Sequence, residues 1–307
     1  MTAYLHGFGK HLPERVVTNA EIAARIGRTA DWIESASGIR ERRWAAPETS
    51  VADLAVAAAE NCLRGTIPEM VLVASGSARP GFPGPAAEVA ARLGCENAPA
   101  IDVPMASAGS LFAMAMAAQF AESCGDVLVI GSEKMSAVLE VGEQDPNTAI
   151  LFGDGAGAAL ISSRPGPWKI LDSILHSDGQ FRGDLSFDWS SPLHMNGLSV
   201  IMQASRKLPA VIGEVLQRQN IEPAQVAQFL LHQANQNLLV RVARAVGAPE
   251  DKFFSNIANY GNTSSASMLI AAAEWAETNP VSGPIVFAAF GAGFHWGALL
   301  AQSIGES

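Results

Sequence analysis

Cysteine and positive charge are both scarce in this chain. Only Cys62, Cys95 and Cys124 carry a thiol among 307 residues, and their spacing does not match a metal site. We therefore expect buried free thiols in a reducing cytoplasm and no bound metal. No apolar run reaches the roughly 18–20 residues of a membrane span, and the first residues lack the charged and apolar segments of a signal peptide. A membrane or secreted protein is therefore not expected.

The balance of charge narrows the range of partners. Lysine and arginine number 20 against 30 acidic residues, which gives a net charge of −10 at pH 7. Nucleic acid and anionic membrane surfaces are therefore not expected as partners, and an acidic protein partner would find no evident attraction. Hydrophobic residues make up 49% of the chain and charged residues only 16%, so we expect a large core and a buried subunit interface.

Short apolar strands alternate with helices along the chain. The strands are continuously apolar and bounded by glycine or proline, which is typical of a sheet covered by helices on both faces. The second part repeats the order of the first, so we predict an α/β fold of two similar halves, 1–163 and 164–307, packed as one body. Helices are expected at 19–26, 50–63, 85–93, 108–121, 200–218, 235–246 and 265–278, and strands at 70–74, 100–103, 127–130, 155–161, 229–231 and 285–289.

One serine lies where a reactive side chain would be well placed. Ser107 falls in VPMASAGSLF at 103–112, where an apolar strand meets a long helix of small and apolar residues. Helix N–H groups and the helix dipole favour negative charge at such a position. A thiol there would ionise readily and attack acyl groups, whereas a serine hydroxyl needs a base beside it. The alternative is an ordinary strand–helix turn in a large core.

Three further polar segments interrupt the apolar background. His232 ends an apolar strand, where open α/β sheets bind ligands, or it is a hydrogen-bonded core histidine. Asn262 precedes the last helix and either offers an amide N–H to an oxyanion or caps that helix. The segment FGAGFHWG at 290–297 either brings its backbone close to another group or forms a bulge between strands. No segment alone decides between its two interpretations.

Together, in this order and spacing, the segments resemble the β-ketoacyl-[acyl-carrier-protein] synthase III family of the thiolase superfamily. The resemblance extends over nearly the whole chain. The matching segments are WI at 32–33, GIRERR at 38–43, GSEK at 131–134, LFGDGAG at 151–157, HQAN at 232–235, YGNTS at 260–264, and FGAG and WG at 290–293 and 296–297.

The resemblance implies a thiolase-like five-layer αβαβα fold of two similar halves, assembled as a homodimer. It also implies an acyltransferase that takes an acyl group from acyl-CoA or an acyl-carrier protein and condenses it with malonyl-carrier protein. Such enzymes act in fatty acid or polyketide-type biosynthesis. The thioesters are substrates, and no separate cofactor is implied.

The resemblance also implies roles for individual residues. His232 and Asn262 correspond to the pair that decarboxylates the malonyl thioester, and Ser107 stands where the family has its nucleophilic cysteine. The backbone N–H groups of Ser107 and Ala292 correspond to an oxyanion hole. The implied substrate-binding residues are Trp32 at the adenine of CoA, Phe82 in the partner subunit's acyl pocket, and Asn235 and Phe290 within the pocket.

Three departures from the family affect the donor and the carrier. Ala36 and Pro146 stand where relatives carry CoA-binding arginines, and Asn237 stands where an arginine helps to dock the carrier protein. Arg241 and Arg244, one and two turns further on, are candidates to replace that arginine. Because arginine forks normally fix the CoA phosphates, we expect the pantetheine part of a thioester to dominate recognition here.

Ser107 itself has three explanations. It is an engineered exchange of cysteine for serine, or a natural branch that uses a Ser–His pair for priming or for acyl transfer to an oxygen or nitrogen acceptor. The third explanation is a catalytically silent subunit that completes a partner's site. A silent subunit is expected to have lost His232 or Asn262 as well, and this chain keeps both. We therefore predict a condensing or acyl-transfer enzyme.

Overall fold

A nine-stranded sheet forms the centre of the computed structural model, which describes residues 2–278 and 282–304. The strand order is β11-β12-β13-β8-β1-β7-β6-β4-β5. Its strands are β1 (Ala3–His11), β4 (Met70–Ala74), β5 (Ala100–Val103), β6 (Val127–Lys134), β7 (Asp154–Ser162), β8 (Trp168–Ser177), β11 (Gln228–Leu231), β12 (Pro284–Gly291) and β13 (His295–Ser303). Two short pairs lie apart from it: β2 (Val16–Thr18) with β3 (Glu41–Arg43), and β9 (Leu185–Ser186) with β10 (His194–Met195).

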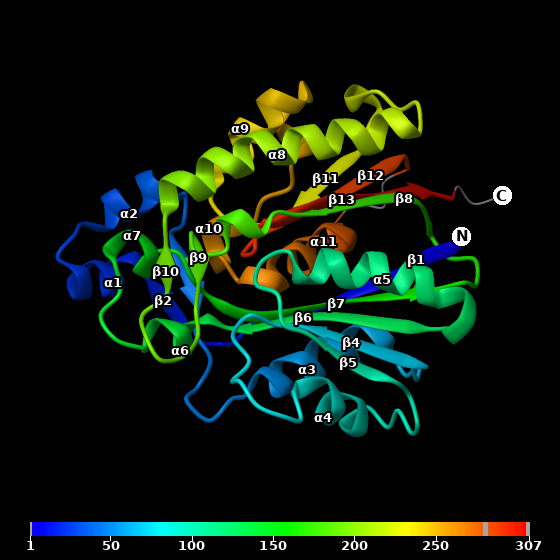
Figure 1. Cartoon of the computed structure of the whole chain (residues 1–307), viewed down its shortest axis with the longest axis horizontal. Helices are drawn as coiled ribbons and strands as arrows, with labels where there is room; N and C mark the ends of the chain where they lie inside the picture. The colour runs from blue at the N-terminus through cyan, green and yellow to red at the C-terminus, as the bar shows by residue number, and fades with distance from the viewer. Residues whose placement is uncertain (1, 279–281, 305–307) are drawn as a thin grey trace.

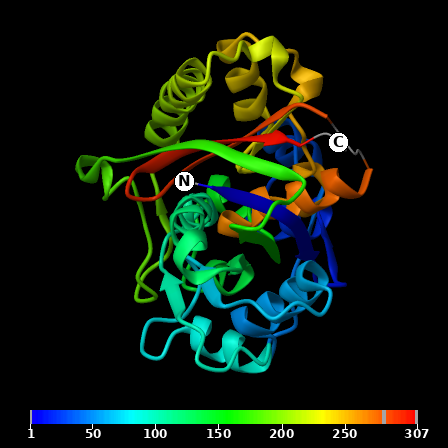
Figure 2. The ribbon, with the colours of Figure 1, turned by 90° about the vertical axis from the view of Figure 1, so that its right-hand side faces the viewer.

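The sheet divides into two parts that enclose a layer of helices. β1 pairs with β7 over most of its length but with β8 only over Ala3, Tyr4 and Leu5, so the two parts separate beyond that point. Helices α5 (Gly109–Cys124) and α11 (Ser267–Thr278) lie between them (Figure 1). Outside, α3 (Val51–Leu63) and α4 (Pro85–Arg92) cover one part, and α8 (Gly197–Arg218) and α9 (Gln236–Val246) cover the other. Figure 2 shows the same layers from the side. The predicted αβαβα architecture is confirmed.

Both parts of the sheet follow one pattern of pairing. β4 runs parallel to β6, which is followed by antiparallel β7 and β1. In the same way β11 runs parallel to β12, which is followed by antiparallel β13 and β8. The predicted division at 163/164 falls in the turn between β7 and β8. The division of the chain into two similar halves, 1–163 and 164–307, stays a prediction.

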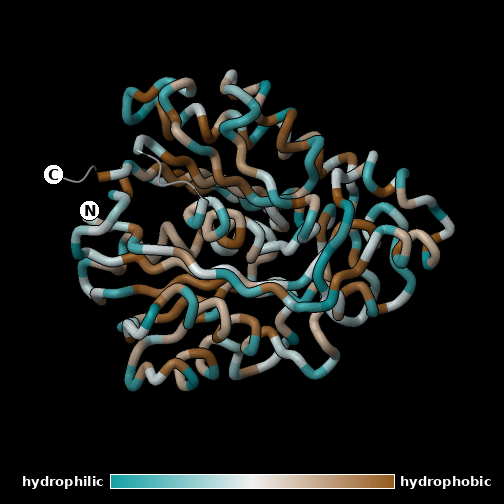
Figure 3. The backbone as a smooth tube through the Cα atoms, turned by 180° about the vertical axis from the view of Figure 1, so that it is seen from behind, coloured by the Kyte–Doolittle hydropathy of each residue, from teal (hydrophilic) through white to brown (hydrophobic). Residues whose placement is uncertain are grey.

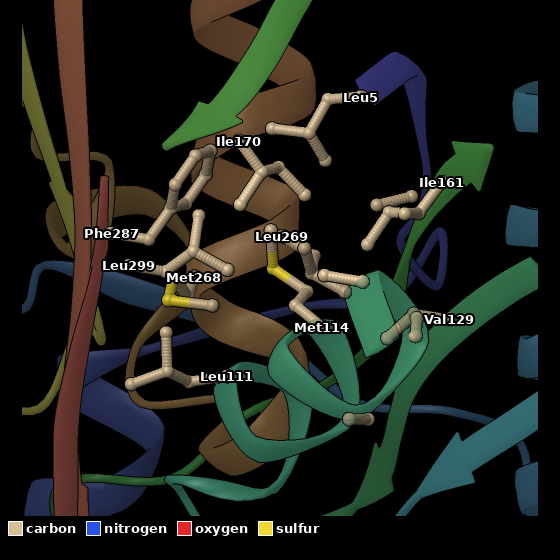
Figure 4. Close-up of a cluster of buried hydrophobic side chains, with 14 of the residues drawn as sticks. Leu5, Leu111, Met114, Val129, Ile161, Ile170, Met268, Leu269, Phe287 and Leu299 are labelled. Carbon is tan, nitrogen blue, oxygen red and sulfur yellow. The ribbon is translucent and has the colours of Figure 1, made fainter. Parts of the chain in front are cut away.

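Apolar residues concentrate in the inner layers. Figure 3 shows hydrophobic residues along the strands, with hydrophilic residues mostly in the outer helices and loops. In the middle layer, Leu111 and Met114 of α5 and Leu269 of α11 are fully buried among strand side chains such as Leu5 and Phe287 (Figure 4). Each such side chain contributes roughly 1.5–3 kcal/mol by its burial. The middle helices therefore tie the two parts of the sheet into one core.

The remaining helices are short and lie near one end of the sheet. They are α1 (Asn19–Ile26), α2 (Ala30–Ser37), α6 (Met135–Leu139), α7 (Pro146–Ala149) and α10 (Ile257–Tyr260). Of these, the sequence analysis placed only α1. It also did not place the long antiparallel strands β1, β8 and β13; polar residues interrupt β1 and β8, whereas the middle of β13 is continuously buried.

In the described ranges no helix is both long enough and apolar enough to cross a membrane. Those ranges also contain no cluster of three His, Cys, Asp or Glu side chains arranged to hold a metal ion. The three cysteines are free; Cys62 and Cys95 are buried, whereas Cys124 is only partly buried.

The close approach of β6 to the residues that precede α11 provides a test of this packing. A Cβ atom on Gly131 would overlap the backbone of Ser265. We expect Gly131→Ala to lower the free energy of unfolding by about 3 kcal/mol, because overpacking forces the backbone to shift. Urea unfolding measures this change.

Gly213→Ala is the matched control. Gly213 lies exposed within α8, and a Cβ atom there would meet no atom within 4 Å. Alanine is the better helix former, so this variant should be more stable than the wild type by about 1 kcal/mol. Equal stability of the two variants would contradict the described contact between β6 and Ser265.

Candidate active site

The three predicted catalytic residues line a single apolar cavity. Ser107, His232 and Asn262 contribute polar groups to a cavity of about 120 Å³. Its other walls are largely apolar: Met135, Leu151, Phe152, Leu185, Leu193, Met195, Val200, Ile201, Ala204, Leu208, Leu238, Leu239 and Phe290. Few polar groups in an apolar pocket are typical of a binding site, and low polarity strengthens every hydrogen bond formed there.

Ser107 lies in a strained turn directly before α5. Its φ of 64° is in the left-handed region, which is uncommon for a residue with a side chain. The Ser107 backbone N–H donates to Ser264 Oγ at 3.0 Å. Within the described residues, the Ser107 hydroxyl makes no hydrogen bond to His232 or to any other group. The structure therefore supplies a helix N-terminus beside this hydroxyl but no base in contact with it.

The hairpin between β12 and β13 packs directly against this turn. A Cβ atom on Gly291 would overlap the backbone of Ala106 and lie 3.0 Å from Ser107 Cβ. Glycine is therefore needed for the close approach, which explains the glycine-rich segment better than a bulge does. Ala292 is the next residue of the hairpin. Its role in an oxyanion hole with the Ser107 amide stays a prediction, and that amide currently donates to Ser264 Oγ.

His232 is positioned by its backbone and by one hydroxyl. Its N–H donates to Ala288 O at 2.9 Å, which extends the pairing of β11 with β12 by one residue. Its ring Nδ1 lies 2.6 Å from Ser267 Oγ. Burial lowers the pKa of the His232 imidazole to about 4, so the ring is neutral at pH 7.

Asn262 is fixed by the loop before β7. Its N–H donates to Leu151 O at 2.8 Å, and its carbonyl accepts from Gly153 N at 3.1 Å. Its side-chain Oδ1 accepts the N–H of Ser264 at 2.8 Å. The side chain therefore caps the turn before α11, and its amide NH₂ group is left to donate elsewhere. Both interpretations of this residue from the sequence remain compatible with the geometry.

A buried carboxylate lies behind these segments. Glu133, at the end of β6, is fully buried and accepts hydrogen bonds from five donors. The donors are the hydroxyls of Ser75 and Ser77 and the backbone N–H groups of Gly76, Ser77 and Ser265. Ser265 also donates its hydroxyl to Met105 O at 2.6 Å, two residues before Ser107. Sequence reasoning included Glu133 and the serine segment in matching motifs but did not identify these supporting roles.

The other predicted substrate-binding residues lie in different surroundings. Phe290 lines the cavity, but Trp32 does not; the Trp32 ring lies on α2 with the Arg28 guanidinium 5.2 Å from its centroid. Asn235 also lines the cavity, yet its amide donates to Ala36 O at 3.0 Å and accepts from Asn237 N at 2.8 Å. The amide of Asn235 therefore ties α9 to α2.

Phe82 lies outside the cavity of its own chain. Its side chain is 99% exposed, which is exceptional for an aromatic residue of a folded protein. Nothing in the described part of the chain covers it. A role for Phe82 at the cavity would therefore need a second molecule.

Comparisons with known proteins agree with this geometry. Residues 101–179 match the family described as 3-oxoacyl-[acyl-carrier-protein (ACP)] synthase III, and residues 216–303 match its C-terminal part. The chain is 35% identical to the β-ketoacyl-[acyl-carrier-protein] synthase III of Desulfotalea psychrophila, over 98% of this chain and 99% of that one. The chain belongs to the 3-oxoacyl-[acyl-carrier-protein] synthase III family. It is therefore an acyltransferase of the condensing-enzyme type, as predicted.

Solved structures of synthase III enzymes share the fold. The enzyme from Aquifex aeolicus superimposes with a TM-score of 0.92 at 32% identity, covering 98% of this chain and 99% of that one. The enzyme from Pseudomonas aeruginosa gives a TM-score of 0.92 at 30% identity, covering 100% of both chains. The roles of Ser107, His232 and Asn262 are not tested by these similarities and stay predictions.

The neutral state of His232 makes the stability of the fold depend on pH. An unfolded histidine has a pKa of about 6.5, whereas burial lowers that of His232 to about 4. Between these values the unfolded chain binds a proton that the folded chain does not, so stability is full above pH 6.5 and is lost as the pH falls towards 4. The loss amounts to about 3 kcal/mol.

We therefore expect the unfolding free energy of the wild type to fall by about 3 kcal/mol more than that of His232→Gln between pH 7 and pH 4. Glutamine does not titrate, so the difference between the two proteins isolates this ring from the carboxylates. Urea unfolding at a series of pH values gives both curves. Parallel curves would show that His232 is not buried as described.

Proposed function

We propose that this chain condenses a short acyl thioester with a malonyl thioester borne by an acyl-carrier protein. The observation that carries the proposal is the meeting of Ser107, His232 and Asn262 on one apolar cavity. The three free thiols support a place of action in the reducing cytoplasm. Fatty acid biosynthesis is the setting of the family, and a polyketide-type pathway would use the same chemistry.

His232 and Asn262 act on the malonyl half of the reaction. Loss of carbon dioxide leaves negative charge on the thioester oxygen of the remaining enolate. Donors fixed beforehand at that oxygen lower the barrier, and an apolar cavity makes them more effective than they would be in water. The enolate carbon then attacks the acyl group held on Ser107. A carbon–carbon bond forms, the bond to Ser107 Oγ breaks, and the hydroxyl regains a proton.

The size of the cavity supports a short acyl group. A dry cavity of about 150 Å³ in a protein core accepts benzene. The cavity beside Ser107 measures about 120 Å³, so it has room for a group somewhat smaller than benzene. We propose acyl chains of about two to four carbons as the preferred donors.

Several exposed apolar groups support the proposed homodimer. β5 is an edge strand of the sheet, and Ile101 on it is 39% exposed. Phe112, Met116 and Phe120 recur every fourth residue along α5 and are only partly buried. An unpaired edge beside apolar side chains is a ready surface for a second copy. We propose that β5 and α5 meet their counterparts there, and that Phe82 enters the partner's acyl pocket.

The departures from the family pattern support weak recognition of the CoA phosphates. Ala36 and Pro146 offer no charge where relatives have arginines, and Asn237 donates its side-chain amide to Ser35 O at 3.2 Å. A donor thioester is then held mainly through its pantetheine arm. The carrier protein meets Arg241 and Arg244 of α9 in place of the missing arginine.

The malonyl half-reaction is the first test of this function. Malonyl-pantetheine decarboxylation should fall by about 10²–10³-fold in His232→Ala and in Asn262→Ala, because each loses one donor to the enolate oxygen. Release of carbon dioxide is the measurement. Asn259→Ala is the matched control, since Asn259 is exposed one turn earlier and its side chain makes no hydrogen bond in the described structure. Unchanged rates in both site variants would exclude a condensing role.

The proposed assembly predicts a dimer at micromolar concentration in sedimentation experiments. Ile101→Asp should shift the equilibrium from dimer towards monomer, because the substitution places a charge on the apolar edge strand β5. Ile304→Asp alters a comparably exposed isoleucine, 48% accessible, at the far part of the sheet and should leave the dimer intact. Phe82→Ala should keep the dimer and lengthen the acyl chain that the enzyme accepts. A stable wild-type monomer would contradict the assembly and the role of Phe82.

Calorimetry can measure how tightly the protein binds the donor thioester. We expect acetyl-CoA and acetyl-pantetheine to bind the wild type within about tenfold of each other, because two arginine contacts of about 1 kcal/mol each are missing. Ala36→Arg should tighten acetyl-CoA about fivefold and leave acetyl-pantetheine unaffected. A strong, salt-sensitive preference of the wild type for CoA would show that other basic residues bind its phosphates.

A further inference from the structure

The hydrogen bonds of Ser267 determine which nitrogen of His232 carries the proton. Ser267 Oγ accepts the N–H of Gln233 at 3.0 Å and lies 2.6 Å from His232 Nδ1. A hydroxyl has one proton to donate. Among the residues that the structure describes, His232 Nδ1 is the one acceptor within hydrogen-bond distance of it. The Ser267 hydroxyl is therefore the donor, and Nδ1 is the acceptor.

A neutral imidazole carries its single proton on the other nitrogen. His232 is buried and neutral, as its lowered pKa indicates. With Nδ1 accepting from Ser267, the proton is on Nε2. The ring lines the cavity, so it presents an N–H group there and not a lone pair. His232 is thus a hydrogen-bond donor to whatever occupies the site.

Asn262 presents a donor as well. Its Oδ1 is engaged by the Ser264 N–H at 2.8 Å, which leaves the amide NH₂ group as its free end. Two donors and no acceptor suit a negatively charged enolate oxygen. They do not suit the removal of a proton from a hydroxyl. Ser107 Oγ, which has no hydrogen-bond partner in the described residues, therefore keeps its proton.

We propose that Ser267 is a positioning residue that holds His232 as the Nε2–H tautomer, and that the site consequently decarboxylates malonyl thioesters faster than it acylates Ser107. This rests on the proposed function, because it uses the same malonyl half-reaction. The additional activity is the conversion of a malonyl thioester into an acetyl thioester and carbon dioxide, without an acyl group on Ser107.

The reaction needs no partner other than water. The bond between the methylene carbon and the carboxylate breaks, and its electron pair enters the thioester enolate, while carbon dioxide leaves. The enolate carbon then takes one proton from water, which gives the acetyl thioester and a hydroxide ion that the solvent neutralises. The two donors bind the enolate oxygen throughout. Nothing is oxidised or reduced by an external group.

Acyl transfer to Ser107 is the slower step for a physical reason. A serine hydroxyl is a weak nucleophile unless a base accepts its proton. The helix N-terminus before α5 stabilises negative charge but does not remove a proton. The enolate therefore usually forms when Ser107 carries no acyl group. In most turnovers the enolate carbon is then protonated and no condensation product forms.

The tautomer can be observed directly in the full-length protein. The chain has six histidines, so ¹⁵N-histidine labelling gives a small set of ring signals, and His232→Gln identifies those of His232. Between pH 6 and pH 8 we expect a protonated Nε2 and a bare Nδ1. A proton on Nδ1 would overturn the inference and leave the proposed condensation untouched.

Ser267→Ala tests the positioning role. Without the hydroxyl, nothing holds the proton off Nδ1, so the ring signals should show a mixture of the two tautomers in place of Nε2–H alone, and decarboxylation of malonyl-pantetheine should fall severalfold. Ser267→Thr retains the hydroxyl and should restore both. Ser205→Ala is the matched control, because the buried Ser205 hydroxyl in α8 has no hydrogen-bond partner in the described structure. An unchanged tautomer and rate in Ser267→Ala would overturn the assignment.

Product analysis tests the uncoupling. With acetyl-pantetheine and malonyl-pantetheine together, the wild type should release carbon dioxide in at least tenfold excess over the 3-oxoacyl product, and intact-protein mass should show an acyl group on only a small fraction of the chains. Ser107→Cys should gain an acyl adduct and raise the share of 3-oxoacyl product. Equal amounts of carbon dioxide and condensation product, with acylated Ser107, would overturn the inference. Unchanged decarboxylation in His232→Ala and Asn262→Ala would instead overturn the proposed function itself.

Discussion

The carboxylate of Glu133 holds together segments that the chain brings from distant parts of its sequence. Burying such a charge costs several kcal/mol unless donors surround it. Here five donors do so, from the loop after β4 and from the turn before α11. Because Ser265 joins this network and also reaches Met105, the turns that carry Asn262 and Ser107 share one anchor. That anchor therefore fixes the relative position of the two turns beside the cavity.

Burial explains which strands the sequence analysis placed correctly. β4 and β5 have the predicted bounds; β4 is a fully buried apolar run, whereas β5 is a short edge strand that two of its exposed residues set apart from β4. β8 reads WKILDSILHS, with buried residues at only two of its positions, so it forms no such run. β1 contains Gly7 and Gly9 and is interrupted by a shift in register. Its pairing with both β7 and β8 depends on residues far along the chain, which local patterns do not show.

The sequence likewise predicted part of the candidate site, namely its three main residues but not the groups that support them. Ser107, His232 and Asn262 each follow or precede a recognisable apolar element, so their positions could be inferred and their family motifs matched. The supporting groups could not, because their contacts span long separations: Ser107 to Ser264 across 157 residues and Glu133 to Ser265 across 132. The donor character of His232 depends on the direction of a single hydroxyl proton. No spacing of residues in a sequence reveals that direction.

The shared middle layer has a consequence for the order in which the chain is made. α11 packs against β1 and β7 from the first part of the chain, yet it ends only at Thr278. On the ribosome, the first part therefore waits roughly 10 s with one apolar face uncovered, at ordinary rates of synthesis. Until α11 emerges, that face is a binding surface for chaperones and for other nascent chains. The fold of the first part of the chain is thus completed by a helix, α11, that is made near the end of synthesis.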